Sequence, residues 1–346
     1  MPRATRKDVA KLAGVSVATV SHILNGRGEE LGFSPDTAIR VKTAAKQVGY
    51  IAHPSARNFR YQKSQVIALF TTEVPASLKL PVFNELLTSV IDRTLAAGYF
   101  VLPVPITQDP YKTIESTLRE VYLAGAIIRD DLALRNIAPL LELNDIPSVW
   151  INTGLATAPS PNLTTVVIDE KPGVAEVITA IETAAAQNQL LVHGPGEPSG
   201  RNEEFLRHFP TATELELPGW LYRDGYAAGE AVLAADPNLI FATNDHIAYG
   251  LLQYFRERSI SFTADFQLFG FGDAEQSPTP SGQLTTVTWP LPQAAAIAVD
   301  LLLSHLRDGQ PLAKGVQQVF GHHCTAAQNN RAVIMAHRDL LRRVTC

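Results

Sequence analysis

The feature that most restricts the fold of this 346-residue chain is an alternation of short apolar runs with amphipathic stretches from about Ser64 onward. The apolar runs have the length of strands, and the stretches between them repeat apolar residues at helical spacing. Strands that alternate with helices form parallel sheets covered by helices. The alternation continues to about Arg307, which is too much chain for one core, so two such α/β subdomains are expected.

The same pattern predicts where individual elements lie. Strands are expected at 65–70, 99–104, 124–128, 148–151, 165–168, 190–193, 214–217, 239–243 and 267–271. Helices are expected at 83–97, 111–122, 174–187, 201–209, 225–235, 246–258 and 294–307. The tail at 332–344 is interpreted as a final helix without sustained leucine heptads, so no coiled-coil tetramer is predicted.

The first 63 residues differ from the rest of the chain in charge. They contain eleven Lys and Arg against four Asp and Glu, a net charge of +7, whereas the whole chain carries −5 and the remainder therefore −12. A basic head on an acidic body indicates a polyanionic partner. A solvated, lysine-rich surface would give the same count, so charge alone does not decide between the two.

Helix signals divide this head into short segments. Thr5 can cap a first helix that carries Leu12 on its apolar stripe, and Gly14 ends that helix in a sharp turn. Ser16 can cap a second helix that runs to about Leu24. Two short helices joined by a glycine turn are typical of a helix-turn-helix, whose second helix lies in the major groove of DNA.

A third helix is expected to support the first two. Ser34-Pro35 has the favoured order of a cap followed by proline at the first helical position, and Gly49 is expected to end the helix. The head is therefore predicted to be an all-α domain at 1–49, followed by a hinge helix and linker at 50–63.

Residues 5–25, TRKDVAKLAGVSVATVSHILN, resemble the opening of regulators of the lac repressor/galactose repressor family. That family reads T-x-x-D-V-A-x-x-A-G-V-S-x-x-T-V-S-R-x-L-N, and only His22 departs from it, where Arg is usual. The family's hinge motif, roughly G-Y-x-P-N-x-x-A-R-x-L, returns at 49–59 with Tyr50 and Arg57 in place.

Phe59 stands where the family's hinge motif has leucine. In this family two hinge helices pair in the dimer, and an apolar side chain from each wedges into a central base step of the minor groove. The resemblance gives this role to Phe59, and unstacking would favour a flexible pyrimidine–purine step. The alternative is that Phe59 packs against the body.

The resemblance also implies which residues of the head contact DNA. Base reading falls to Val17 and Ala18, which offer apolar contact such as that to a thymine methyl, and to His22, which can donate to guanine or accept according to its tautomer. The alternatives are that Val17 and Ala18 only pack the helix and that His22 is merely exposed. Phosphate contacts fall to small or planar donors: Thr5, Ser16, Thr19, Ser21, Asn25 and Tyr50. In the hinge, Arg57 and Phe59 are also expected to bind DNA.

The body resembles the type I periplasmic-binding-protein fold of sugar-responsive repressors. The resemblance rests on short motifs in the family's order and spacing: VVID (166–169), HGP (193–195), RNEEF (201–205), DGYAAG (224–229), NDHIAYG (244–250), GFGD (270–273) and LTTV (284–287). It fades after about residue 310. It implies two discontinuous subdomains, about 64–163 with 290–322 and about 164–289 with 323–346, with the ligand between them at the carboxyl ends of strands.

Six effector contacts follow from the resemblance: Thr72, Asn152, Arg201, Trp220, Asn244 and Asp273. The planar fork of Arg201 can grip two ligand oxygens, Asn244 offers a donor and an acceptor, and Trp220 matches a ring that stacks on a sugar. The family's ligand-gripping Asp is Gly272 here, so either Asp273, one position on, replaces it or the ligand lacks the hydroxyl or amine that it would bind. The alternatives are that Arg201 forms a surface ion pair, Trp220 belongs to the core and Asn244 serves a turn.

The chain is therefore predicted to be a cytoplasmic, sequence-specific DNA-binding transcription repressor, homodimeric on a palindromic operator. Its effector is expected to be a sugar, and a purine or nucleoside stays open because it too would use an aromatic face. Neither a cofactor nor a metal is expected. No membrane contact is expected either, since no apolar run approaches the roughly 18–20 residues of a membrane span and the N-terminus lacks a signal-peptide core.

Two other classes of protein are less compatible with the sequence. A solute-binding protein would share the body but would carry a signal peptide and no helix-turn-helix. An enzyme would need a catalytic constellation, and neither a nucleophile nor a metal set accompanies the nearest candidates, Asp169 and His193. The glycine-rich run at 194–200 lacks the Lys-Ser/Thr of a phosphate-binding loop.

Overall fold

The chain forms two compact units, residues 1–64 and 65–346. The computed structural model describes 4–50, 64–72, 81–106, 109–129, 132–152, 160–180, 188–196, 198–260, 267–272, 284–320 and 324–325. The helix expected at 332–344 lies outside these residues.

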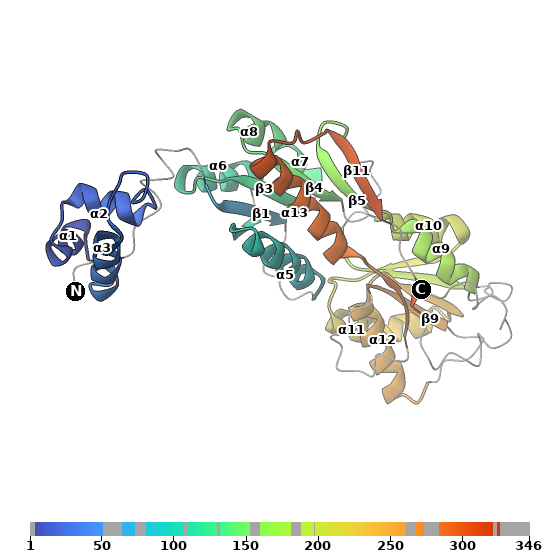
Figure 1. Cartoon of the computed structure of the whole chain (residues 1–346). Coiled ribbons are helices and arrows are strands. Elements are labelled where there is room, and N and C mark those ends of the chain that lie inside the picture. The colour runs from blue at the N-terminus through green and yellow to red at the C-terminus, as the bar shows by residue number, and fades with distance from the viewer. Residues whose placement is uncertain are drawn as a thin grey trace. The chain divides into compact units, whose positions relative to one another are not determined.

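The first unit contains the three expected helices: α1 (Arg6–Ala13), α2 (Val17–Leu24) and α3 (Pro35–Gln47) (Figure 1). Each begins where its cap predicts. Thr5 forms a capping box, Ser16 Oγ accepts from the Thr19 amide at 3.0 Å, and Ser34 Oγ accepts from the Thr37 amide at 3.3 Å. These bonds satisfy amides that have no partner within the helix and so fix where it starts.

A small core joins the three helices. Val9, Val20 and Val41 contribute one fully buried side chain from each helix. The expectation that Leu12 also faces this core is wrong, because its side chain is 52% exposed. Val9, Ala10 and Ala13 form the buried stripe of α1, and Leu12 lies roughly 100° around the helix from its centre.

The second unit contains two six-stranded sheets. The first has the order β11-β5-β4-β3-β1-β2, and the second β12-β10-β9-β8-β6-β7. All neighbours pair in parallel except β10 and β12. The strands of the first sheet are β1 (Val66–Thr72), β2 (Phe100–Ile106), β3 (Gly125–Arg129), β4 (Ser148–Asn152), β5 (Thr164–Ile168) and β11 (Gly315–Phe320). Those of the second are β6 (Gln189–His193), β7 (Thr213–Glu216), β8 (Leu239–Ala242), β9 (Gln267–Gly272), β10 (Thr285–Thr288) and β12 (Cys324–Thr325).

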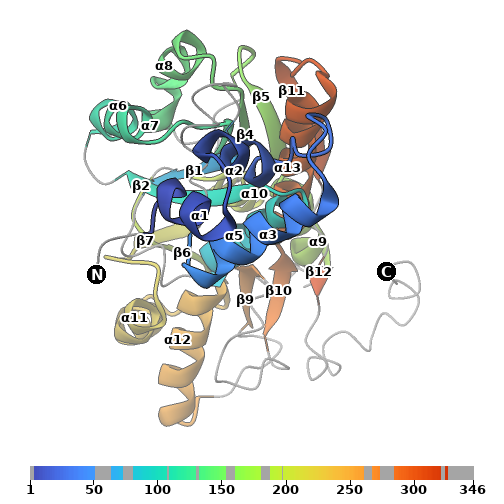
Figure 2. The same ribbon diagram turned by 60° about the vertical axis from the view of Figure 1, so that its left-hand side comes forward.

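Helices cover both faces of the first sheet (Figures 1 and 2). Alternate residues of β1 divide between the two faces, as the period of a strand requires. Ile67 and Leu69 enter a core shared with α5 and α13, whereas Ala68 and Phe70 enter a core shared with α6, α7 and α8. These helices are α5 (Pro81–Ala96), α6 (Pro110–Glu120), α7 (Leu132–Arg135), α8 (Ala138–Leu143) and α13 (Leu291–Asp308).

The second sheet repeats this arrangement. Leu190 and Val192 of β6 face α11 and α12, and Leu191 between them faces α9 and α10. The helices are α9 (Lys171–Ala180), α10 (Gly200–His208), α11 (Tyr222–Ala234) and α12 (Asp245–Glu257). Each sheet therefore has two cores, and the carboxyl ends of its parallel strands are joined to the following helices by loops.

One predicted boundary needs correction. Residues 164–168 were expected to open the second subdomain, but they form β5, which pairs with β4 and β11 in the first sheet. The chain leaves the first sheet only after Ile168 and enters the second subdomain at α9. It returns between β10 and α13 and leaves again between β11 and β12.

Several elements were not predicted. The strands β10, β11 and β12 and the short helices α7 and α8 are additional to the sequence-based assignment. In β11 the run GVQQVF places two glutamines between its apolar residues, which hides the strand pattern. None of the helices in the described part combines the length and apolar character that a bilayer crossing needs.

Candidate nucleic-acid and effector sites

The start of α2 presents small apolar side chains outward. Val17 is 41% exposed and Ala18 is also exposed, whereas Val20 and Ile23 on the other side of the helix are buried in the head core. The Ser16 cap fixes the first turn of the helix. This face of α2 can therefore make apolar contact with a partner without any change in the core of the head.

The polar residues expected to contact phosphates are held in local hydrogen bonds. Thr5 Oγ1 donates to Asp8 Oδ2 at 2.7 Å. At the other end of α2, Ser21 Oγ accepts from Asn25 Nδ2 at 3.3 Å. Each of these bonds leaves further donor or acceptor capacity on the side chain and limits its rotation.

Tyr50 is tied to the first helix. Its hydroxyl oxygen accepts a hydrogen bond from Nε of Arg6 at 3.1 Å, which joins the end of the head to α1. The same hydroxyl keeps its own hydrogen for a second bond. Tyr50 is half-buried, and it packs against the core of the three helices.

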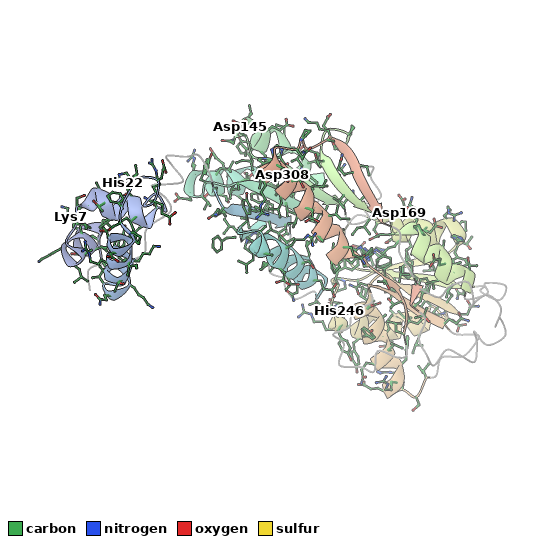
Figure 3. The ribbon with its side chains drawn as sticks, viewed as in Figure 1. Lys7, His22, Asp145, Asp169, His246 and Asp308 are labelled. Carbon is green, nitrogen blue, oxygen red and sulfur yellow. The ribbon has the colours of Figure 1, made fainter. Side chains whose placement is uncertain are left out.

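His22 lies on α2 and is half-buried (Figure 3). Its ring stacks with Phe33, with ring centroids 6.4 Å apart and planes at 25°. Phe33 lies just before the Ser34 cap of α3, so the stack ties the orientation of His22 to the loop between the two helices. The hinge residues Arg57 and Phe59 lie outside the described residues.

The expected effector residues that the structure describes lie at or after the carboxyl ends of strands, where open α/β sheets bind their ligands. Thr72 ends β1, and Asn152 ends β4 with a side chain only 2% exposed. Arg201 lies in the first turn of α10, which follows β6. Asp273 lies outside the described residues.

Arg201 is buried and engaged in an ion pair with Glu170. Arg201 is 8% exposed and Glu170 is 1% exposed. Arg201 Nε donates to Glu170 Oε2 at 2.9 Å, Nη2 donates to Glu170 Oε1, and Nη1 donates to the Thr243 carbonyl at 2.8 Å. The guanidinium also lies 3.9 Å from the ring centroid of Phe271. The ion-pair alternative for Arg201 therefore describes this geometry, though in the interior and not at the surface.

Glu170 was not among the residues expected from the sequence. It follows β5 of the first sheet, next to Asp169 (Figure 3), and it meets Arg201 of the second subdomain. Burial raises the pKa of its carboxyl group, and the charge and hydrogen bonds of Arg201 act in the opposite direction. Because an arginine stays protonated in proteins, the bidentate contact supports the charged form of the pair. The only signal in the sequence was an acidic Asp-Glu pair directly after an apolar strand.

Trp220 and Asn244 are linked to one another and to the loop after β6. Trp220 Nε1 donates to the Pro195 carbonyl at 3.1 Å, and a Cβ on Gly194 would lie 2.4 Å from the indole ring. Asn244 caps α12 by accepting from the Ile247 amide at 2.8 Å and donates to the Trp220 carbonyl at 2.9 Å. The ring thus packs on glycine backbone, and part of the hydrogen-bonding capacity of Asn244 serves structure.

Gly272, which stands at the family's usual Asp position, ends β9 with φ +133°. An L side chain rarely adopts this conformation, so an aspartate here would be strained. A Cβ at this position would lie 3.6 Å from Oδ2 of Asp245. Asp245 is 1% exposed, and its other oxygen, Oδ1, accepts from Thr286 Oγ1 at 2.6 Å. A carboxylate is therefore already present beside Gly272, supplied by α12, the helix that precedes β9.

Trp289 lies between β10 and α13, where the chain returns to the first subdomain. It packs against hydrophobic cores of both subdomains and lies 4.8 Å from the Arg201 guanidinium. Its buried indole N–H has no hydrogen-bond partner among the described residues. Glu170 lies where the chain first leaves the first subdomain, and Trp289 lies where the chain returns to it. Both residues contact Arg201.

Each of the two units matches a known protein family. Residues 5–53 match the model of bacterial regulatory proteins of the lacI family, and residues 166–322 match the periplasmic binding protein-like domain. The chain is similar to the HTH-type transcriptional repressor PurR of Haemophilus influenzae, with 26% identity over 331 residues that cover 91% of this chain and 94% of the relative.

Two solved structures have the same fold. The lac repressor dimer bound to operator and the anti-inducer ONPF aligns with a TM-score of 0.75 at 22% identity, covering 94% of this chain and 98% of that chain. The complex of the transcriptional regulator CelR with cellobiose aligns with a TM-score of 0.61 at 20% identity, covering 94% and 99%. The chain therefore combines a head of the lacI family of bacterial regulatory proteins with a periplasmic binding protein-like body.

Proposed function

We propose that this protein represses transcription by binding a palindromic operator and that a small molecule bound in the body controls this binding. The observation that carries the proposal is the α2 helix, which is capped at Ser16 and presents exposed Val17 and Ala18 beside His22. Such a helix start is the part of a helix-turn-helix that reaches base edges in the major groove.

Within this proposal the head divides its contacts between bases and backbone. Val17 and Ala18 contact thymine methyls, and His22 hydrogen-bonds a base edge. The oxygen- and amide-bearing side chains bind phosphates and fix the register on the duplex: Thr5, Ser16, Thr19, Ser21, Asn25 and Tyr50. In the hinge, Arg57 continues this role and Phe59 is the minor-groove wedge.

A homodimer is proposed because one small head contacts few phosphates and two heads match the symmetry of a palindrome. The lac repressor of the solved complex is a dimer on its operator, which supports the same assembly for this chain. Action on chromosomal DNA implies that the protein works in the cytoplasm and that its activity is regulatory and not catalytic.

The effector is proposed to be a sugar that binds at the carboxyl ends of the strands. The CelR complex with cellobiose, which has the same fold, supports this ligand class. Asn152, Arg201, Trp220 and Asn244 lie at or directly after such strand ends, and Thr72 and Asp273 complete the proposed set. A purine or nucleoside is the second candidate, since the indole of Trp220 suits its flat face as well.

Effector binding is proposed to alter the arrangement of the two subdomains. The chain passes between them three times, so a change at the strand ends acts on these connections. A coupling of about 1–3 kcal/mol would change operator affinity by roughly 5- to 150-fold.

DNase I footprinting on the DNA upstream of the protein's own gene tests this function. We expect a protected, approximately palindromic site whose protection changes with one member of a panel of sugars and nucleosides. Protection that none of the panel alters would leave DNA binding intact and refute the proposed effector classes. Absence of any protected site would refute the regulator itself.

The two serine caps of the head provide a test of the recognition helix. Ser16→Ala and Ser34→Ala each remove one cap bond of the same type, and each should lower the stability of the head by about 1 kcal/mol. Only Ser16→Ala should weaken operator binding at a temperature where both variants are folded, because Ser16 starts α2. Thermal unfolding and gel-shift titration measure the two effects. Equal loss of DNA affinity in the two variants would contradict the assignment of α2.

A further inference from the structure

The fork of Arg201 is occupied by a carboxylate of the chain itself. Its Nε and Nη2 donate to the two oxygens of Glu170, and its backbone amide donates to Oε2 at 3.2 Å. Nη1 donates to the carbonyl of Thr243. The guanidinium thus makes with Glu170 the same bidentate contact that it would make with the carboxylate or phosphate of a ligand.

This pair lies where ligands of parallel sheets bind. Glu170 follows the carboxyl end of β5 in the first sheet, while Arg201 follows β6 and Thr243 follows β8 in the second. The contact therefore joins the carboxyl ends of strands from both sheets. Phe271 at the end of β9 and Trp289 after β10 contact the guanidinium from the same region.

The electrostatics of this region do not favour an anion. Glu170 neutralises Arg201, and Asp245, which is 1% exposed, adds a second carboxyl group at the end of β8. His246 (Figure 3) follows Asp245, and burial lowers its pKa, which favours the neutral form of its ring. Arg129 ends β3 in the other sheet and already has an interaction partner.

We propose that Glu170 determines specificity by filling the Arg201 fork, so that this regulator responds to an uncharged effector and rejects carboxylate- and phosphate-bearing ones. A carboxylate or phosphate would have to displace a buried, bidentate partner or lie beside its negative charge. A hydroxyl-bearing ligand faces neither requirement and can use a neutral group at the strand ends such as Asn244, whose amide has hydrogen-bonding capacity beyond its bonds to Ile247 and Trp220. The inference rests on the proposed function and narrows its ligand class.

The first experiment measures operator affinity of the wild-type protein with matched probes. Glucose is compared with gluconate and glucose 6-phosphate, and ribose with ribose 5-phosphate, at constant ionic strength. We expect every probe that shifts operator affinity to be uncharged. An acid or phosphate ester that shifts it, whether through Arg129 or Arg201, would overturn the inference and leave the regulator function standing. Loss of operator binding in all conditions would instead count against the proposed function.

The second experiment asks whether Glu170 is what blocks the fork. Acetate and inorganic phosphate are titrated against the wild-type protein, Glu170→Gln and the double variant E170Q/R201M, with chloride as the ionic control, and thermal unfolding is followed. We expect Glu170→Gln to bind acetate on the order of tenfold more tightly than the wild type, with the gain absent in the double variant. Equal responses in the wild type and Glu170→Gln would overturn the inference. If Glu170→Gln does not fold, the wild-type protein alone decides. The inference would be overturned if the wild type bound acetate or phosphate as tightly as it binds its uncharged effector.

Discussion

Replacing Arg201 with methionine is expected to lower the free energy of unfolding of the body by about 3–5 kcal/mol, because it leaves the carboxylate of Glu170 buried without its charge partner. The substitution also removes the hydrogen bond to the Thr243 carbonyl at 2.8 Å. Urea unfolding of the full-length protein, followed by far-ultraviolet circular dichroism, measures the loss.

Two further variants serve as controls for Arg201→Met. Arg119→Met breaks an exposed pair with Glu115 one turn away on α6 and should cost at most about 0.5 kcal/mol. The double variant E170L/R201M removes both buried charges and should recover much of the loss. A loss in Arg201→Met no larger than that in Arg119→Met would show that Glu170 does not depend on Arg201 in the folded state.

Gly225→Val is expected to disrupt the second subdomain, with a loss above about 3 kcal/mol or no soluble protein. Helices α11 and α12 approach so closely that a Cβ on Gly225 would lie 2.2 Å from the backbone carbonyl oxygen of Ile247. Backbone atoms cannot rotate away as a side chain can, so the two helices would have to separate. Expression, gel filtration and urea unfolding measure the effect.

Ala227→Val is the matched control in the same helix. Ala227 is exposed, and the substitution adds the same β-branched side chain with only the lower helix propensity of valine, about 0.5 kcal/mol. Its unfolding transition should therefore stay close to that of the wild type. If Gly225→Val behaved like Ala227→Val, the close approach of the two helices would be refuted.

The features predicted correctly from sequence depend on residues that are near one another along the chain. Each capping pair of the head, such as Ser16 with Thr19, spans three positions. Most strands and helices of the body were visible for the same reason, since each shows its own apolar period, whereas β11 was missed because two glutamines interrupt that period. Leu12 was misplaced because one turn of a helix admits several apolar stripes, and only packing against the other helices selects between them.

The features missed from sequence depend on which distant segments meet. The run at 164–168 was recognised as a strand, but its sheet is decided by pairing with β4 and β11. Arg201 was recognised as a polar group at a strand end, whereas its partner Glu170 lies 31 residues away in a loop after the other sheet. Because β5 was assigned to the second subdomain, Glu170 and Arg201 were both expected there. Their contact between the two subdomains was therefore missed.

The pairing of β5 with β11 also has a consequence for synthesis on the ribosome. Gly315 of β11 pairs opposite Thr164 of β5, so nearly the whole second sheet is translated before this strand emerges. Until then the edge of β5 presents unpaired backbone N–H and C=O groups, which are a template for pairing with other chains. The head, which is a contiguous segment, can complete its core as soon as α3 has emerged. A nascent chain that stalls before residue 315 would therefore carry a finished DNA-binding head on a body with an open, aggregation-prone edge.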